Sequence, residues 1–149
     1  PGLSVAAKIS ETALADYDRL MNVNVKGSFL AAKHFIPLTA ADACPQIILI
    51  SSMAAGRANP NAPLYCAAKA AVSMMGEGLA LQLKESNVRV TTLKPGPVDT
   101  QGFWGNRPVP REKFMRPENV AAVVQFVLEQ PRHIVMHEVA FESFEFFKK

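Results

Sequence analysis

The stretch Gln46-Ile47-Ile48-Leu49-Ile50-Ser51 decides the fold class of this chain. It is short, apolar and rich in β-branched residues, and polar residues do not alternate with the apolar ones. Such a stretch is typical of a strand buried on both faces, as in a parallel sheet that helices cover. A loop of small residues and prolines follows it, from Ser52 to Pro63.

Helical and strand patterns alternate on both sides of this strand. Upstream, apolar residues recur with a helical period from about Thr12 to Pro37, with Ser10 or Thr12 as the N-terminal cap and a possible bend at Gly27. Downstream we expect a helix over 64–85, a strand over 87–93, an irregular flap over 99–116, a helix over 117–129 and a strand over 135–141. This order predicts an α/β fold with a parallel sheet.

The helix expected over 64–85 is rich in alanine and methionine and is apolar nearly all round. A helix of this kind is buried on more than one side. We therefore expect a second helix or another subunit to cover its outer face.

The composition excludes two classes of partner. The chain has 149 residues, of which 49% are apolar, which suits one domain with a hydrophobic core. Its formal charge of +3 comes from scattered lysines and arginines, whereas nucleic-acid-binding proteins cluster them. No apolar run approaches the ~20 residues of a membrane span. We therefore expect neither a nucleic acid nor a membrane as partner.

The cysteines and histidines do not form a recognisable metal site. Cys44 and Cys66 have neither metal-ligand nor CxxC spacing, which suits reduced thiols in a cytoplasmic protein. His34, His133 and His137 are spread along the chain without a metal-binding pattern. We therefore expect a cytoplasmic location and no bound metal.

The strongest local signal for chemistry is Tyr65-Cys66-Ala67-Ala68-Lys69, at the start of the long helix. Four residues at ~100° each make about one turn, so Tyr65 and Lys69 project from the same face. A phenol has a pKa of about 10, and a fixed ammonium beside it lowers that pKa. The pair can thus serve as a general acid or base. Taken alone the pattern is short, and a surface tyrosine and a solvated lysine also explain it.

Ser52 adds context, because it follows the first buried strand, where ligand clefts open in parallel sheets. The loop between Ser52 and Tyr65 can fold the two together. A hydroxyl there can hydrogen-bond a carbonyl oxygen as charge develops on it. For Ser51-Ser52 alone, a plain turn at a strand end is the simpler explanation.

Four blocks of sequence together resemble the short-chain dehydrogenase/reductase family in order and spacing. They are Met21-Asn22-Val23-Asn24-Val25-Lys26-Gly27, Ile50-Ser51-Ser52-Met53-Ala54-Ala55-Gly56, Tyr65 to Lys69, and Pro95-Gly96-Pro97-Val98-Asp99-Thr100. Each block is a weak signal by itself, and the four in order are a strong one. The resemblance runs from about Ser10 to at least Pro131.

The resemblance implies a role for each matching residue. Tyr65 exchanges the proton with the substrate oxygen, Lys69 lowers the pKa of Tyr65 and binds the nicotinamide ribose, and Ser52 holds the substrate oxygen. Asn24 positions a water next to Lys69 in a proton relay. The cofactor-binding residues are Tyr65, Lys69, Pro95, Gly96, Val98 and Thr100. In Pro95-Gly96, the absence of a side chain on the glycine lets backbone pass close to a ligand.

The resemblance also implies a three-layer, Rossmann-like parallel sheet with flanking helices, of which this chain carries only the second half. In the family the dinucleotide lies on a Gly-rich loop after the first strand, and the sequence contains no such loop. We therefore expect residues 1–149 to form a partial domain, belonging to a longer enzyme or a truncated gene product. Its central strands and long helices would then be partly exposed.

The function implied by the resemblance is hydride transfer between a secondary alcohol and a ketone, with NAD or NADP as cofactor. The expected partners are a small alcohol or carbonyl substrate and further copies of the chain, in a dimer or tetramer. The determinant that separates NAD from NADP lies outside the sequence. The substrate is not readable either, because Phe103, Trp104 and Phe114 in the flap either cover an apolar substrate or pack locally.

Two other functions stay open. A non-catalytic remnant would keep only the long helices and act as a dimerisation module, although its four catalytic candidates are intact. A sugar-nucleotide epimerase or dehydratase of the extended branch of the family would share the Tyr/Lys pair. The short flap argues against this last alternative.

Overall fold

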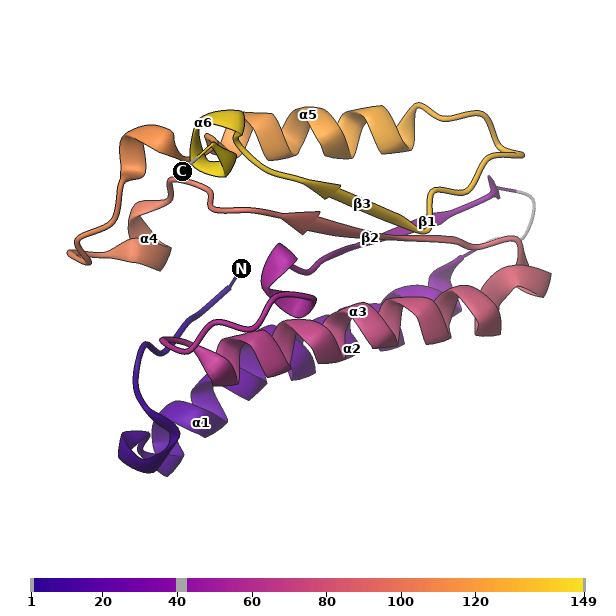
Figure 1. Ribbon diagram of the computed structural model, residues 1–149. Helices are drawn as coiled ribbons and strands as arrows, with labels where there is room; N and C mark the ends of the chain where they lie inside the picture. Colours follow the sequence, from indigo (N-terminus) through magenta and orange to yellow (C-terminus); the bar gives the residue numbers. More distant parts are fainter. Residues whose placement is uncertain (1, 40–42, 149) are drawn as a thin grey trace.

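A computed structural model describes residues 2–39 and 43–148, which form three layers (Figure 1). A parallel sheet in the order β1-β2-β3 is the middle layer, with α1, α2 and α3 on one face and α5 on the other. The strands are β1 (Gln46–Ile50), β2 (Arg89–Pro95) and β3 (Glu138–Phe141), and the helices are α1 (Leu14–Met21), α2 (Gly27–Phe35), α3 (Pro63–Leu83), α4 (Gln101–Trp104), α5 (Pro117–Leu128) and α6 (Phe144–Phe147). The predicted α/β fold is confirmed. None of the helices in the described ranges combines the length and apolar character needed to cross a membrane.

The fully enclosed strand is β2, whereas the sequence indicated β1. Ile47 and Leu49 of β1 are buried, but Ile50 is 41% exposed. The reason is position: β1 is an edge strand of the described sheet and β2 lies between β1 and β3. The two strands pair in register from Gln46 opposite Arg89 to Ile50 opposite Leu93. The exposed strand edge that the sequence predicted is thus present.

The upstream helix is interrupted by a wide turn. A π-helical segment, η2 (Asn22–Lys26), separates α1 from α2, directly before Gly27 where the bend was predicted. Its N-terminus differs from the prediction, because the capping position is Ala13 and a short 3₁₀ turn, η1 (Ile9–Glu11), precedes it. The Thr12 hydroxyl donates to the carbonyl of Lys8 and so does not cap α1.

The core lies between α3 and the sheet. Gly76 makes this close packing possible, because a Cβ on it would lie 2.2 Å from Thr92 Oγ1 and 3.3 Å from Leu49 Cδ1. The apolar core is formed by residues of β1, α3 and β2 and of the turn between the last two: Ile47, Leu49, Val72, Leu83, Val88 and Val90.

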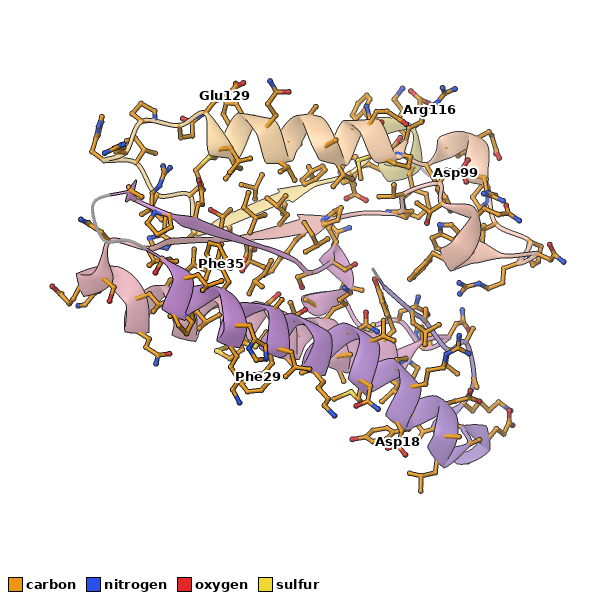
Figure 2. The ribbon with its side chains drawn as sticks, turned by 180° about the vertical axis from the view of Figure 1, so that it is seen from behind. Asp18, Phe29, Phe35, Asp99, Arg116 and Glu129 are labelled. Atoms are coloured by element: carbon orange, nitrogen blue, oxygen red, sulfur yellow. The ribbon has the colours of Figure 1, made fainter. Side chains whose placement is uncertain are left out.

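On the side away from the sheet, helices α2 and α3 carry exposed apolar side chains. Met74 and Leu81 of α3 are 65% and 72% exposed. Phe29 of α2 is half exposed and lies on the side of the helix remote from the sheet (Figure 2). In the described chain these faces have no cover, and their burial against another subunit stays a prediction.

An apolar groove of about 560 Å³ runs between α2 and the free edge of β1. Val23, Gly27, Ala31 and Phe35 form its helical wall, and the strand forms the other. A free strand edge beside an apolar wall is the arrangement that a further strand or chain segment would complete.

The chain beyond β2 is more ordered than the sequence indicated. The flap (residues 99–116) contains α4 and a 3₁₀ turn, η7 (Arg111–Lys113), and its two ends are joined by a bridge between Val98 and Met115. The last strand begins at Glu138, later than expected. The short helix α6, which the sequence did not predict, follows it.

The contrast between two glycines of α3 gives a test of this packing. Gly76→Ala is expected to lower the free energy of unfolding by about 1–3 kcal/mol, because the added Cβ overlaps the Thr92 hydroxyl. Gly78 is exposed and a Cβ there meets nothing within 4 Å, so Gly78→Ala is expected to raise stability by up to ~1 kcal/mol through helix propensity. Urea unfolding of both variants measures the difference, and equal stabilities would contradict the packing of α3.

Candidate active site

The site lies at the carboxyl edge of the sheet, where the segments that follow the three strands meet. Ser52 follows β1, Gly96 follows β2 and Glu142 follows β3. Because all strands are parallel, these three segments meet at one edge. A cleft of about 600 Å³ opens there, and all three residues line it together with Tyr65.

Ser52 is held by two local contacts. It begins the 3₁₀ turn η5 (Met53–Ala55), and its Oγ accepts the backbone N–H of Ala54 at 3.1 Å. The same hydroxyl lies 3.4 Å from the Pro95 carbonyl, to which it donates. These contacts tie the loop after β1 to the segment after β2 and leave Ser52 facing the cleft.

Tyr65 and Lys69 share a face of α3, as the one-turn spacing predicted. The Lys69 Nζ lies 5.8 Å from the centroid of the Tyr65 ring. The side chain of Lys69 is buried, with 4% of the residue exposed, and its ammonium donates to the carbonyl of Ile50 at 3.0 Å. Ser51 Oγ in turn donates to the Lys69 carbonyl at 2.8 Å. The start of α3 is thereby fixed against the end of β1.

The protonation of this pair differs from the prediction. Burial raises the pKa of Tyr65 above its ordinary value, and the hydrogen bond from Ser52 offsets only part of that rise. Burial also lowers the pKa of the Lys69 ammonium, to about 8, and the ammonium donates to the Ile50 carbonyl. The expected direction for Tyr65 is therefore wrong in this structure, and the phenol is the stable form at neutral pH.

Asn24 lies in the π-helical segment η2 and is 2% exposed. Its Nδ2 donates to the carbonyls of Leu3 at 2.8 Å and Leu20 at 3.0 Å. Its Oδ1 is buried and has no hydrogen-bond partner within the described residues. The structure thus places Asn24 in the interior without a bond to Lys69, and its role in a proton relay stays a prediction.

The segment from Pro95 to Thr100 runs from the end of β2 into the flap. A Cβ on Gly96 would lie 2.5 Å from the Cβ of Glu142, so the glycine is required here by a protein neighbour. The Val98 carbonyl accepts the Trp104 indole N–H, and the Thr100 carbonyl accepts the first backbone bonds of α4. Pro95, Gly96, Val98 and Thr100 therefore shape the mouth of the cleft, and their cofactor contacts remain predicted.

Aromatic rings from four segments form a connected cluster beside the cleft. Tyr65 contacts Phe103 with ring centroids 5.5 Å apart, and Phe103 contacts Trp104 at 5.0 Å. Trp104 then contacts the buried Phe114, which contacts Phe146 of α6. Of the flap aromatics, Phe103 and Trp104 line the cleft and Phe114 packs behind them, and a role in covering a substrate stays a prediction.

Three charged residues of the cleft were not found by sequence reasoning. Arg57 Nη1 lies 3.1 Å from Glu142 Oε1, which joins the loop after η5 to the end of β3. Arg107 of the flap is the third charged residue of the lining. Arg57 and Glu142 are 85 residues apart, so no local pattern connects them. Arg107 follows two aromatic residues in a loop rich in glycine and proline, which was the available signal.

Comparison with known proteins decides the family. Residues 1–109 match the family model described as short chain dehydrogenase. This chain belongs to the short-chain dehydrogenase family. The family assignment from four sequence blocks is thereby confirmed. The Rossmann-type layer arrangement is confirmed as well, because solved structures with that fold superpose on nearly the whole of this chain.

Three relatives illustrate the match. An uncharacterized oxidoreductase of Staphylococcus aureus (strain MRSA252) is 30% identical over 138 residues, which are 93% of this chain and 59% of that protein. An alcohol dehydrogenase from the archaeon Thermococcus sibiricus, complexed with 5-hydroxy-NADP, superposes with a TM-score of 0.86 at 24% identity and covers 97% of this chain and 61% of its own. A blue fluorescent protein from a metagenomic library, in complex with NADPH, has a TM-score of 0.82 at 27% identity and covers 96% and 61%. This short-chain dehydrogenase chain thus spans about three fifths of the length of these relatives.

The buried ammonium of this short-chain dehydrogenase predicts a pH-dependent stability. In the unfolded chain Lys69 keeps its proton up to about its ordinary pKa of 10.5, whereas in the folded chain the proton leaves near pH 8. Between these values the unfolded state binds more protons, so stability rises with pH, by on the order of 3 kcal/mol in total. Urea unfolding from pH 7 to 10.5 is expected to show this rise in the wild type relative to Lys69→Met, in which the titrating group is gone. Parallel pH profiles of the two proteins would contradict the burial of the charge.

Proposed function

We propose that this chain is the catalytic part of an NAD- or NADP-dependent oxidoreductase that interconverts a secondary alcohol and a ketone. The observation that carries the proposal is the arrangement of Tyr65, Ser52 and Lys69 at one end of the sheet. Tyr65 and Ser52 line the same cleft, and Lys69 lies directly behind Tyr65. An acid and an oxygen-binding hydroxyl in one cleft, with a cation beside the acid, are the groups that carbonyl reduction requires of a protein.

The protonation of the site suits the reduction of a ketone. Because burial raises the pKa of Tyr65, its phenol carries a proton at neutral pH and can give it to the substrate oxygen. Ser52 Oγ, which faces the cleft, can turn its proton from the Pro95 carbonyl to the same oxygen as negative charge develops there. In the reverse direction Tyr65 accepts the proton of the alcohol, and a charged Lys69 favours the phenolate that this step needs.

The residues beside Tyr65 suit the nicotinamide end of a dinucleotide. The Lys69 ammonium has three donors, and within residues 2–39 and 43–148 only the Ile50 carbonyl accepts one of them. The remaining two are available to ribose hydroxyls, which are neutral acceptors. When bound, the nicotinamide supplies or accepts the hydride at the substrate carbon. Relatives described in complex with 5-hydroxy-NADP and with NADPH support this choice of cofactor, and Pro95, Gly96, Val98 and Thr100 are the proposed backbone contacts.

The proposal concerns residues 1–149 as a partial Rossmann-fold domain. The chain spans about three fifths of its relatives, so the activity of the whole protein is part of the proposal. The apolar groove along β1 is the surface on which the rest of a complete sheet would pack. A cytoplasmic location remains a prediction.

We further propose that the protein assembles as a dimer or tetramer through the exposed faces of α2 and α3. Phe29, Met74 and Leu81 give these faces the apolar character of an interface between subunits. Sedimentation of a monomer at micromolar concentration would exclude this assembly. Association alone would leave the arrangement of Tyr65, Ser52 and Lys69 unexplained, which is why a purely dimerising role is the weaker alternative.

Titration of the purified 149-residue chain with NADH and NADPH, followed by cofactor fluorescence, tests the proposed function. Saturable binding is expected, and Lys69→Ala should abolish or strongly weaken it because the ribose contact is lost. Tyr65→Phe should keep binding but lower the rate of ketone reduction by about 10²–10⁴-fold, since the proton donor is removed.

Lys113→Ala is the matched control, because Lys113 is an exposed flap residue outside the cleft. Its binding should equal that of the wild type. A folded chain that binds neither cofactor, or that binds equally well without Lys69, would contradict the proposed site.

A further inference from the structure

The charged residues of the cleft do not cancel one another. Two arginines and one glutamate line it, and Glu142 is paired with Arg57 at 3.1 Å. Arg107 forms no ion pair with any residue in the described part of the chain. The cleft therefore carries one uncompensated positive charge, which belongs to Arg107.

The guanidinium of Arg107 is held in place by the flap. Its Nε donates to the Trp104 carbonyl at 3.1 Å and its Nη2 donates to the Phe103 carbonyl. The same group lies over both rings, with Cζ 5.2 Å from the centroid of Phe103 and 5.0 Å from that of Trp104. These contacts use one edge of the guanidinium, and Nη1 has no acceptor within the described residues. A fixed guanidinium with free donors is suited to bind a carboxylate.

Phe103 connects this cation to the proposed proton donor. Its ring contacts both Tyr65 and the Arg107 guanidinium. A ligand that reaches both groups must therefore pass along an apolar surface. Its reacting oxygen would lie at Tyr65 and its negative end at Arg107, with a short apolar stretch between them.

We propose that the substrate of this cleft is a keto acid or hydroxy acid, whose carboxylate binds Arg107 and lies several bonds from the carbon that reacts at Tyr65. This inference rests on the proposed function, because it names the substrate class of the same site. It adds Arg107 as a specificity-determining residue. Arg57 is not that residue, since Glu142 already neutralises it.

Trp104 provides a direct probe, because it is the single tryptophan of the chain and lies under the Arg107 guanidinium. The 149-residue chain is titrated, without any dinucleotide, with 5-oxohexanoate, with its methyl ester and with inorganic phosphate at constant ionic strength. The expected result is a saturable change in tryptophan fluorescence with the acid, and at least a tenfold weaker response with the ester and with phosphate.

Two variants assign the response to a residue. Arg107→Gln should abolish the response to the acid, and Arg107→Lys should retain part of it because the charge remains. Lys113→Gln removes a nearby positive charge outside the cleft and should bind like the wild type. Circular dichroism of each variant reports whether the fold is kept, and if Arg107→Gln does not fold, the comparison of acid with ester in the wild type decides.

Several outcomes would overturn the proposal. These are no response to the acid, an equal response to acid and ester, an equal response to phosphate, and full binding by folded Arg107→Gln. Because the titration contains no cofactor, its failure is separate from failure of the oxidoreductase proposal. Reduction of neutral ketones as fast as of the acid would support the oxidoreductase function and refute the carboxylate site.

Discussion

The hydrogen bond from the buried Lys69 ammonium to the Ile50 carbonyl is the interaction on which the site depends. Burial of a charged group is costly unless hydrogen bonds compensate it, and here one carbonyl at the end of β1 accepts the bond. That contact joins the second turn of α3 to the sheet, and the bond from Ser51 to the Lys69 carbonyl reinforces it. Since Tyr65 lies one turn earlier on the same helix, its ring is directed to the cleft.

The second constraint is the close approach of chain segments that two glycines permit, one in the middle of the sheet and one at its carboxyl edge. Gly76 lets α3 pack directly against Thr92, and Gly96 lets the chain after β2 pass beneath Glu142. The three segments that follow the parallel strands then converge, and the ion pair between Arg57 and Glu142 joins the first to the last. The cleft is therefore assembled from residues that are far apart in the chain, while its chemistry is carried by one turn of helix.

What could be predicted from the sequence was local. The helical spacing of Tyr65 and Lys69 fixed their shared face, and the apolar stretch at β1 with the α/β alternation indicated the parallel sheet. The degree to which β1 is enclosed could not be predicted, because it depends on which neighbours the strand has. The direction of the Tyr65 pKa was wrong for a similar reason, since it follows mainly from burial in the folded cleft. The charges of Arg57, Glu142 and Arg107 gave no pattern, because their partners lie on other segments or are backbone carbonyls.

Transfer of deuterium tests the central claim, that this arrangement performs hydride transfer, most directly. The 149-residue chain is incubated with NADH and NADPH deuterated at the transferring position and a panel of ketones, and the alcohols are analysed by mass spectrometry. The account predicts one deuterium on the carbinol carbon of the product, formed by the wild type and not by Tyr65→Phe. Bound cofactor without any deuterated alcohol, or the same yield from Tyr65→Phe, would contradict it.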